Sequence, residues 1–162
     1  MRYLAYLPAC ILMEVVAFLL SPVVALFVNK QGWLPSRLWA FQTPDNSCDG
    51  DEGHLIRWRG RPVYFRRVAW LARNRAYGFK LLTIGCWYQK YETKGDPAIR
   101  NRGNARAGSF VLRGNLGNWY YKTIKPIGFN YCIQLALGWQ LDSPIGGRCL
   151  FMFSPRITRF YP

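Results

Sequence analysis

The residues best suited to chemistry lie in one short acidic segment, residues 42–54. The segment holds four of the eight acidic residues of the chain and its single histidine: Asp45, Asp49, Asp51, Glu52 and His54. Oxygen ligands at alternate positions can surround a hard cation such as calcium, and a histidine beside them can serve as a ligand or as an acid–base group. The three aspartates and the histidine therefore form a candidate site for a divalent cation.

The match to a known cation-binding loop is partial. An EF-hand loop that begins at Asp45 would place Gly50 at its sharp turn, but its twelfth position is Ile56, where a bidentate Glu is required. The Asx, Pro and Gly residues also predict a plain surface loop, whose acids pair with nearby arginines and cap a helix. The sequence favours this second interpretation, so we expect no cofactor, and a divalent cation at this loop is the alternative.

Other catalytic arrangements find little support. The five cysteines are scattered and never form a CxxC pair, which is typical of reduced thiols: Cys10, Cys48, Cys86, Cys132 and Cys149. A cysteine nucleophile would need the fold to bring His54 to one of these thiols. The chain has neither a serine elbow nor a glycine-rich phosphate loop. We therefore favour a protein that is not an enzyme and assign no catalytic residue.

The charge balance indicates an anionic partner. The chain has 22 Lys and Arg against 8 Asp and Glu, a net charge of +14. Such an excess attracts nucleic acid, phosphate-rich ligands or an acidic lipid leaflet, and the charge alone does not distinguish them. Arginines of one predicted helix and of one Gly- and Asn-rich loop are expected to make the contacts, unless these are ordinary solvated surfaces: Arg66, Arg67, Arg73, Arg100, Arg102 and Arg106.

Residues 4–28 form one long apolar run in which Glu14 is the single formal charge. About 20 helical residues cross a hydrocarbon core of about 30 Å, so the run is long enough for a transmembrane helix. Pro22 would kink or end this helix unless the Ser21 hydroxyl satisfies the carbonyl that the proline leaves free. A signal peptide cleaved after Ala25 and a buried helix of a soluble fold are the alternatives.

The residues around the run predict its orientation. Lys30 and Arg37 follow it, against Arg2 before it, so the positive-inside rule places the rest of the chain in the cytoplasm. We therefore expect a single-pass inner-membrane protein, with an anchor helix at residues 1–29 and one basic domain at residues 30–162. Three aromatic residues are expected at the membrane–water interface, or packed on the end of the helix: Trp33, Trp39 and Phe41.

Hydrophobic periodicity predicts an α+β fold for the basic domain. A basic helix is expected over residues 63–77 with Gly78 as its stop, followed by mostly strand over residues 79–91. The remainder predicts an antiparallel meander sheet of four or five strands. Its expected strands are residues 109–113, 119–125, 130–141 and 148–154.

Two details of this meander follow from single residues. Pro126 and Gly128 are expected to break the second strand, since proline cannot donate to a ladder. The third strand carries the clearest signal, because apolar residues from Tyr131 and Ile133 to Leu141 alternate with smaller or polar ones. This period of two predicts that the odd-numbered residues form one buried face.

Several segments together resemble a known group of proteins. They are Phe41-Gln-Thr-Pro-Asp-Asn46 with Asp49-Gly-Asp51, residues 70–79, Leu137-Gly-Trp-Gln-Leu141 and Phe151-Met-Phe-Ser-Pro155. This combination, behind an N-terminal membrane segment, resembles a family of small uncharacterised proteins of tailed phages and prophages. The resemblance covers most of the chain after the apolar run. It implies a phage accessory protein, and it implies no activity, substrate or functional residue.

Two functions are compatible with these features. The first is a membrane-anchored, non-enzymatic accessory protein of phage type, whose basic face binds acidic lipid or nucleic acid. The second is a divalent-cation-dependent phosphoester hydrolase, in which Asp45, Asp49, Asp51 and His54 hold metal and water while arginines clamp the phosphate. The sequence favours the first and leaves the oligomeric state open.

Overall fold

The computed structural model of the chain describes residues 2–100 and 106–160. These residues form two compact units, residues 1–84 and residues 85–162, and each unit is described by itself. The first is helical and contains the apolar run and the acidic segment, and the second is built on an antiparallel sheet. The α+β class, with an apolar N-terminal helix and a five-stranded antiparallel sheet, is confirmed. The division at residue 29 into an anchor and one domain stays a prediction.

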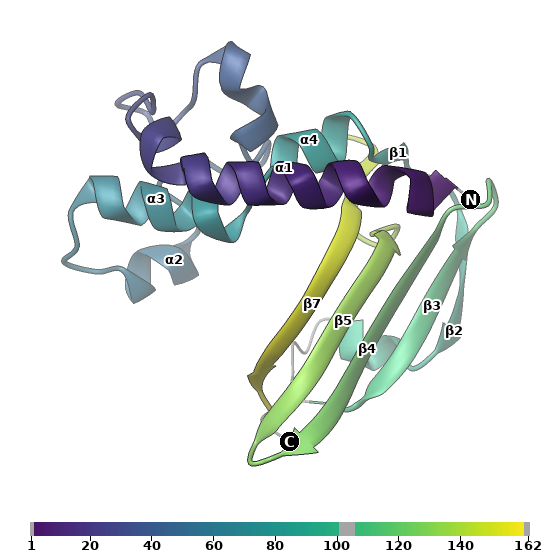
Figure 1. Cartoon of the computed structure of the whole chain (residues 1–162). Helices are drawn as coiled ribbons and strands as arrows, with labels where there is room; N and C mark the ends of the chain where they lie inside the picture. Colours follow the sequence, from purple (N-terminus) through teal and green to yellow (C-terminus); the bar gives the residue numbers. More distant parts are fainter. Residues whose placement is uncertain (1, 101–105, 161–162) are drawn as a thin grey trace. The chain divides into compact units, whose positions relative to one another are not determined.

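The first unit consists of one long helix and four short ones (Figure 1). They are α1 (Arg2–Ala25), the 3-10 helix η1 (Ser36–Phe41), α2 (Glu52–Arg57), α3 (Val63–Arg73) and α4 (Tyr77–Leu82). The helix α1 packs along α3, and α4 packs on η1. A small core joins the end of α1 to α3 and to the loop between them: Val24, Ala25, Cys48, Trp70 and Leu71.

Proline does not interrupt α1. Pro22 has no N–H to donate to the carbonyl of Phe18, one turn earlier. The Ser21 hydroxyl donates to this carbonyl at 2.8 Å, which is the compensation that the sequence predicts. The helix therefore continues to Ala25.

The structure corrects the helix predicted over residues 63–77. The helix ends at Arg73, Ala76 adopts a left-handed conformation (φ 49°), and α4 then begins at Tyr77. Gly78 is therefore inside a helix and is not a stop, and residues 79–82 are helical where strand was expected. The reason is tertiary, because a Cβ at Gly78 would collide with the backbone carbonyl of Trp39 in η1. The glycine is needed for the close approach of α4 to η1.

The second unit contains a five-stranded antiparallel sheet in the order β2-β3-β4-β5-β7. Its strands are β2 (Tyr91–Gly95), β3 (Gly108–Gly114), β4 (Trp119–Gly128), β5 (Tyr131–Trp139) and β7 (Phe151–Arg159). A short second sheet pairs β1 (Cys86–Trp87) with β6 (Arg148–Cys149), and a 3-10 helix, η2 (Pro97–Arg100), contacts β3 and β4. The connections from β2 to β5 form the expected meander.

Three prolines test the strand assignments. The sequence predicts that Pro126 and Gly128 break β4, and the structure corrects this, because β4 continues to Gly128 and keeps its pairing with β5 through an irregularity between Pro126 and Gly128. Pro155 lies inside β7, which extends beyond the predicted residue 154 to Arg159. The strand β7 is at the edge of the sheet, where a residue without an N–H is tolerated. Pro144 lies outside the strands, in the connection before β6.

One face of the sheet carries the core of the second unit. Phe110, Leu112, Tyr120 and Ile124 are buried on it, and Ile99 of η2 is buried as well. The register places Ala136 of β5 on this same face, opposite Lys122 and Phe110. The buried side of β5 is therefore the side of Cys132 and Ala136.

The prediction that the odd-numbered residues of β5 are buried is consequently wrong for the first half of the strand. Tyr131 and Ile133 are 43% and 42% exposed, whereas Cys132 is fully buried. Alternation identified the strand, but small residues occupy the core side because the bulky residues of β3 and β4 already fill it.

Candidate functional site

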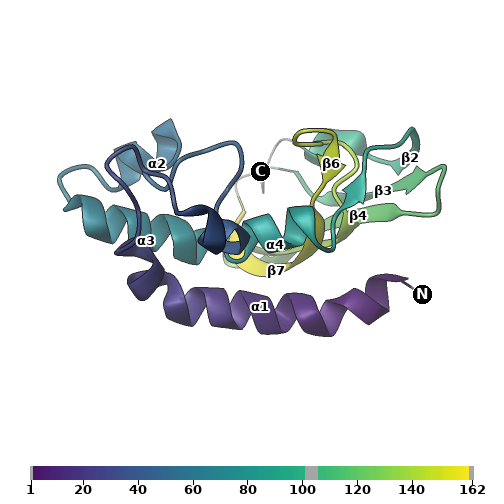
Figure 2. The same cartoon turned by 90° about the horizontal axis from the view of Figure 1, so that it is seen from above.

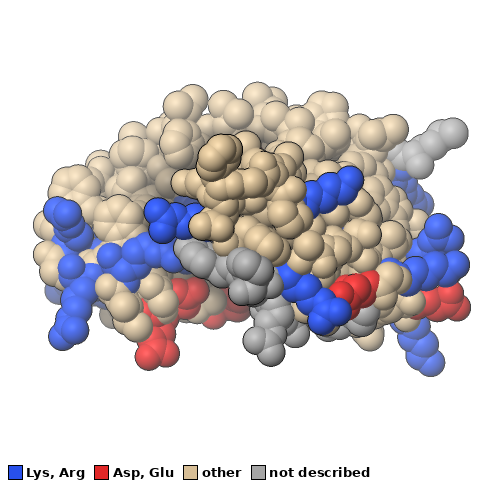
Figure 3. All heavy atoms as spheres, turned by 90° about the horizontal axis from the view of Figure 1, so that it is seen from below, with Lys and Arg blue, Asp and Glu red and all other residues tan. Residues whose placement is uncertain are grey.

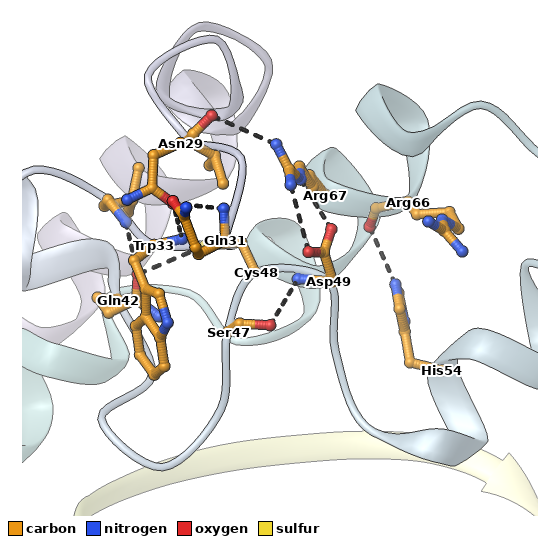
Figure 4. Close-up of polar contacts among 12 residues, drawn as sticks. Asn29, Gln31, Trp33, Gln42, Ser47, Cys48, Asp49, His54, Arg66 and Arg67 are labelled. Carbon is orange, nitrogen blue, oxygen red and sulfur yellow. Dashed lines mark hydrogen bonds and ion pairs between the residues drawn. The ribbon is translucent and has the colours of Figure 1, made fainter.

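In the acidic loop, the Asp49 carboxylate is paired with Arg67 of α3. Arg67 donates from Nε to Oδ1 at 2.8 Å and from Nη2 to Oδ2 at 3.2 Å, and the two side chains are 13% and 30% exposed (Figure 4). The third nitrogen, Nη1, donates to the carbonyl of Val28 at 3.3 Å. One guanidinium thus ties the acidic loop to the residues that follow α1. An ion pair with two hydrogen bonds fixes the relative orientation of the two side chains in addition to compensating their charges.

Asp51 and His54 organise the start of α2. Asp51 is the N-cap, and its carboxylate accepts a hydrogen bond from the His54 backbone N–H at 2.7 Å. The His54 ring is 1% exposed, packs edge-on against Trp70 and lies 2.9 Å through Nε2 from the carbonyl of Arg66. Because a carbonyl only accepts, Nε2 carries the proton in this contact. His54 therefore joins α2 to α3.

Asp45 lies apart from these contacts on the surface of the loop. Together with burial, which is the larger cause, it raises the pKa of Tyr77 to about 12. Within residues 2–100 and 106–160, no three His, Cys, Asp or Glu side chains gather in a group that could hold a metal ion. The four candidate cation ligands are thus placed in three different structural settings.

The segment between Gln42 and Cys48 forms a second set of polar ties. The Gln42 side chain accepts from the Leu34 N–H at 3.0 Å and donates to the Asn46 carbonyl at 2.9 Å. The buried Thr43 hydroxyl donates to the same carbonyl at 2.7 Å and accepts from the Trp70 indole N–H at 3.1 Å. These bonds close the loop on itself and attach it to α3.

Cys48 belongs to the core and not to a reactive site. Its side chain is fully buried, and its N–H donates to the Gly32 carbonyl at 2.7 Å. Burial is the main cause that raises the pKa of the Cys48 thiol to about 11, and the lowering effect of the Arg67 charge and the weaker raising effect of the Asp49 carboxylate partly cancel each other. The Cys48 thiol is therefore protonated at neutral pH, whereas a nucleophilic cysteine has to be a thiolate. All five cysteines are free thiols in the structure.

The predicted anion-binding arginines do not share one environment. Arg66 and Arg67 are half-buried, and the charge of Arg67 is compensated by Asp49. Arg73 is exposed, with its guanidinium 5.7 Å from the centre of the Trp70 ring. In the second unit, Arg106 pairs with Asp96 at 2.8 Å on the surface. The side chain of Arg100 and all of Arg102 lie outside the described residues.

Exposed arginines that the sequence analysis missed lie in the first unit. Arg75 is exposed, and its guanidinium is 5.7 Å from the centre of the Phe18 ring on α1. Arg57, Arg59 and Arg61 are exposed in succession at the end of α2 and beyond it. On the face shown in Figure 3, Lys and Arg side chains form several separate groups, and acidic side chains lie next to some of them. Alternation of arginine along a turn-rich stretch was the available signal for residues 57–61.

The helix α1 has two different sides. Its buried residues fall on one face and are mostly small: Tyr3, Cys10, Ala17, Ser21, Val24 and Ala25. Eight of its large apolar residues are exposed elsewhere on the helix, and each of these is at least 41% accessible: Leu4, Ile11, Leu12, Val15, Phe18, Leu19, Leu20 and Val23. Leu26 and Phe27, directly after the helix, are exposed too. We call this exposed set the outer face of α1.

The charge of Glu14 lies on the inner side of α1. Its carboxylate is paired with the ammonium of Lys80 in α4 at 2.8 Å, and the two side chains are only 16% and 13% exposed. The predicted interfacial aromatics divide into two kinds. Trp33 and Trp39 are 40% and 42% exposed, whereas Phe41 packs against the core of the first unit.

These features define the class of the protein. It is an α+β protein with one N-terminal helix that, among the described residues, is long and apolar enough to cross a membrane. The chain belongs to a family of unknown function, DUF7338, whose model matches residues 1–158. No curated protein and no solved structure matches the chain.

Proposed function

We propose that this protein is a membrane-bound, non-enzymatic accessory protein of phage or prophage type, which binds the anionic lipid surface of the inner membrane from the cytoplasmic side. The observation that supports it best is the outer face of α1. Ten large apolar side chains stay exposed there, and an exposed apolar surface of this extent is typical of an interaction site. A bilayer is the surface that such a helix suits by length and composition.

The exposed basic side chains favour a membrane that contains anionic lipid. Arg73 and Arg75 are exposed in the first unit, and the chain carries a net charge of +14. Each Lys or Arg near an acidic leaflet adds about 1 kcal/mol of attraction, which fades within a Debye length. Arg75 lies against Phe18 of the outer face, so at this point the cation and the apolar surface are adjacent. This adjacency favours acidic lipid over nucleic acid as the partner.

The acidic loop supports this function better than a phosphoester hydrolase. Asp49 is held by Arg67, Asp51 caps α2, and His54 is buried against Trp70. Each of these contacts would have to break before the group could bind a cation and a water molecule. The loop is accordingly the element that fixes α2 and α3 beside the end of α1.

Vesicle flotation tests the proposed function. The full-length protein is mixed at low salt with vesicles of phosphatidylcholine, or of phosphatidylcholine with one third phosphatidylglycerol. We expect stronger binding to the anionic vesicles, and we expect high salt to remove this difference while binding through α1 remains. Arg73→Glu with Arg75→Glu should weaken the anionic preference, and Glu92→Gln serves as a control for a single exposed charge change in the second unit.

Two results would reject the proposal. Equal binding to both vesicle types together with tight binding to DNA would identify nucleic acid as the partner. Release from cell membranes by a salt wash alone, before any alkaline carbonate wash, would show that α1 does not enter the bilayer. For the hydrolase, Asp49→Ala with Asp51→Ala is decisive: a loss of divalent-cation binding in a variant that stays folded would favour the enzyme.

A further inference from the structure

From Glu14 to its C-terminal end, α1 has different surroundings on its two sides. On its inner side, polar groups of residues 64–80 lie beside it at three levels. Arg67 donates to the Val28 carbonyl, the Tyr64 hydroxyl donates to the Pro22 carbonyl at 3.0 Å, and Lys80 pairs with Glu14. Helical rise places Glu14 about 16 Å from Ala25, where α1 ends. Protein therefore covers the inner side of α1 from its end to its middle.

This cover conflicts with a helix that stands upright in the bilayer. The helix α1 is about 36 Å long, so an upright span would place its middle residue, Glu14, near the bilayer midplane. Lys80 would be carried to the same depth. Arg75 contacts Phe18, only one turn from Glu14, so its exposed guanidinium would lie in hydrocarbon.

The backbone that carries Arg75 adds a second conflict. Residues 74–76 connect α3 to α4 and are not helical, and Ala76 is left-handed. Irregular backbone is tolerated at membrane depth only when protein or a water-filled cavity surrounds it. An exposed arginine in such a connection has its natural place among lipid headgroups and water.

We propose that α1 lies in the plane of the bilayer instead of crossing it. Its outer face enters the acyl region of the cytoplasmic leaflet, and its inner side stays covered by α3 and α4 (Figure 2). Both ends of α1 are then on the same side of the membrane. This inference rests on the membrane binding proposed above and specifies its geometry.

Charge and aromatic side chains agree with an in-plane helix. The outer face is bordered by exposed cations at its two ends, Arg2 and Lys30, and at Phe18 by Arg75. In the in-plane arrangement all three reach phosphates of one leaflet, which is the pattern of interfacial helices on acidic membranes. Trp33 and Trp39, exposed just beyond α1, are the residue type that prefers the headgroup level. The partner is thus an anionic bilayer surface.

Interfacial helices are usually amphipathic by themselves, and α1 is apolar on nearly all sides. The difference is explained by its packing, because the polar half is supplied by Arg67, Tyr64 and Lys80 of the neighbouring helices. The membrane-binding element is accordingly the helical unit of residues 1–84 and not α1 alone.

Protease protection of the full-length chain distinguishes the two arrangements. The protein carries different peptide tags at its two ends and is expressed in bacteria, from which right-side-out and inside-out inner-membrane vesicles are prepared. An in-plane helix predicts that both tags are protected in right-side-out vesicles and both are removed in inside-out vesicles. Detergent-treated vesicles must lose both tags in either case, which controls for cleavage.

A single transmembrane span predicts a different pattern, because each vesicle type would then lose one tag and keep the other. That result would overturn the in-plane arrangement and leave membrane binding intact. If the chain is not recovered with the vesicles at all, the proposed function fails and the in-plane arrangement fails with it. No substitution is needed, so a folding defect of a variant cannot imitate any of these outcomes.

Discussion

In residues 1–84, side-chain contacts join the helices to one another, and many large apolar residues of α1 are exposed. Arg67, Lys80 and His54 each join segments that are distant in sequence, and α1 buries small residues such as Ala17. Residues 85–162 are stabilised in a different way. A main-chain ladder of five strands forms the frame, and Phe110, Ile124 and Phe151 are buried.

The difference shows what each unit requires from its surroundings. In the second unit, large apolar side chains such as Phe110, Leu112 and Ile124 are removed from water in the core of the sheet. In the first unit, α1 buries small residues such as Ala17 and exposes leucines, so an apolar phase that covers its outer face would remove a large apolar surface from water. Under the proposed function, the bilayer is the apolar phase that covers the outer face of α1, and the core of the second unit involves no such phase.

The largest expected effect is on membrane binding through the outer face. Leu12→Gln with Leu19→Gln, at two residues that are 63% and 67% exposed, should lower binding to vesicles by a hundredfold or more. Burying one leucine side chain contributes about 1.5–3 kcal/mol, and the double variant loses two such contributions. The measurement is vesicle flotation at several lipid concentrations.

The matched variant lies in the second unit. Leu116 is 71% exposed in the turn between β3 and β4, and Leu116→Gln should leave binding unchanged. An equal loss in both variants would mean that both units bind lipid, and the contrast drawn above would be abandoned.

The next effect compares two ion pairs. Lys80→Met leaves the Glu14 carboxylate buried without its partner, which should cost about 3–5 kcal/mol of unfolding free energy. Arg106→Met removes the surface pair with Asp96, where the side chains are 60% and 33% exposed, and should cost less than about 1 kcal/mol. Urea unfolding of the full chain in detergent, followed by tryptophan fluorescence, measures both.

The double variant Glu14→Gln, Lys80→Met refines this comparison. It removes both charges together, so most of the lost stability should return. A double variant as unstable as Lys80→Met alone would show that packing of the lysine stem, and not its charge, is what α1 requires.

Alkaline pH should weaken the first unit next. Burial raises the pKa of Cys48 from 9.0 to about 11, and that of Tyr77 from 10.0 to about 12. The unfolded chain therefore loses these protons before the folded chain does, so stability is complete below pH 9 and falls as the pH rises towards 11. The Cys48 contribution alone is about 2–3 kcal/mol.

Chemical denaturation at pH 8, 9, 10 and 11 measures the decline. The variant Cys48→Ala should reduce the decline that begins at pH 9 and keep the later part due to Tyr77. An unchanged profile in this variant would contradict the assignment to Cys48.

The sequence predicted those parts of the fold that depend on local pattern. The length of α1, the role of Ser21 beside Pro22 and the antiparallel meander all follow from neighbouring residues. The cap of α2 by Asp51 and the pairing of an acid with an arginine follow from the loop interpretation, and both occur.

The remaining features depend on contacts between distant segments. Gly78 looks like a helix stop, but its place is set by the Trp39 carbonyl, which no local pattern reveals. Similarly, the alternation in β5 does not show which face is buried, because the bulk of Phe110 and Tyr120 decides that. The sequence identifies Glu14 as the single charge of the apolar run, but its partner Lys80 lies 66 residues away and no local pattern indicates it. Arg75 was missed because only its contact with Phe18 makes it informative.

The smallest expected effect concerns an exception in the second unit, the tip of the β4–β5 hairpin. Phe129 has a left-handed backbone (φ 51°) and is 97% exposed. A left-handed conformation costs a bulky residue about 1–2 kcal/mol, and an exposed ring returns little of it. Phe129→Asn should therefore raise the unfolding free energy by about 1 kcal/mol, since asparagine tolerates this conformation.

Ala76, left-handed as well but buried, provides the comparison in the first unit. Ala76→Gly relieves the same backbone conformation, but it also loosens the unfolded chain, so its gain should be smaller than that of Phe129→Asn. The decisive additional measurement is flotation of Phe129→Asn. If this variant is more stable and binds vesicles as before, the strained tip is a local feature of the hairpin. If it is more stable but binds vesicles less, the strain maintains an exposed ring for lipid, and the second unit would share the membrane requirement of the first.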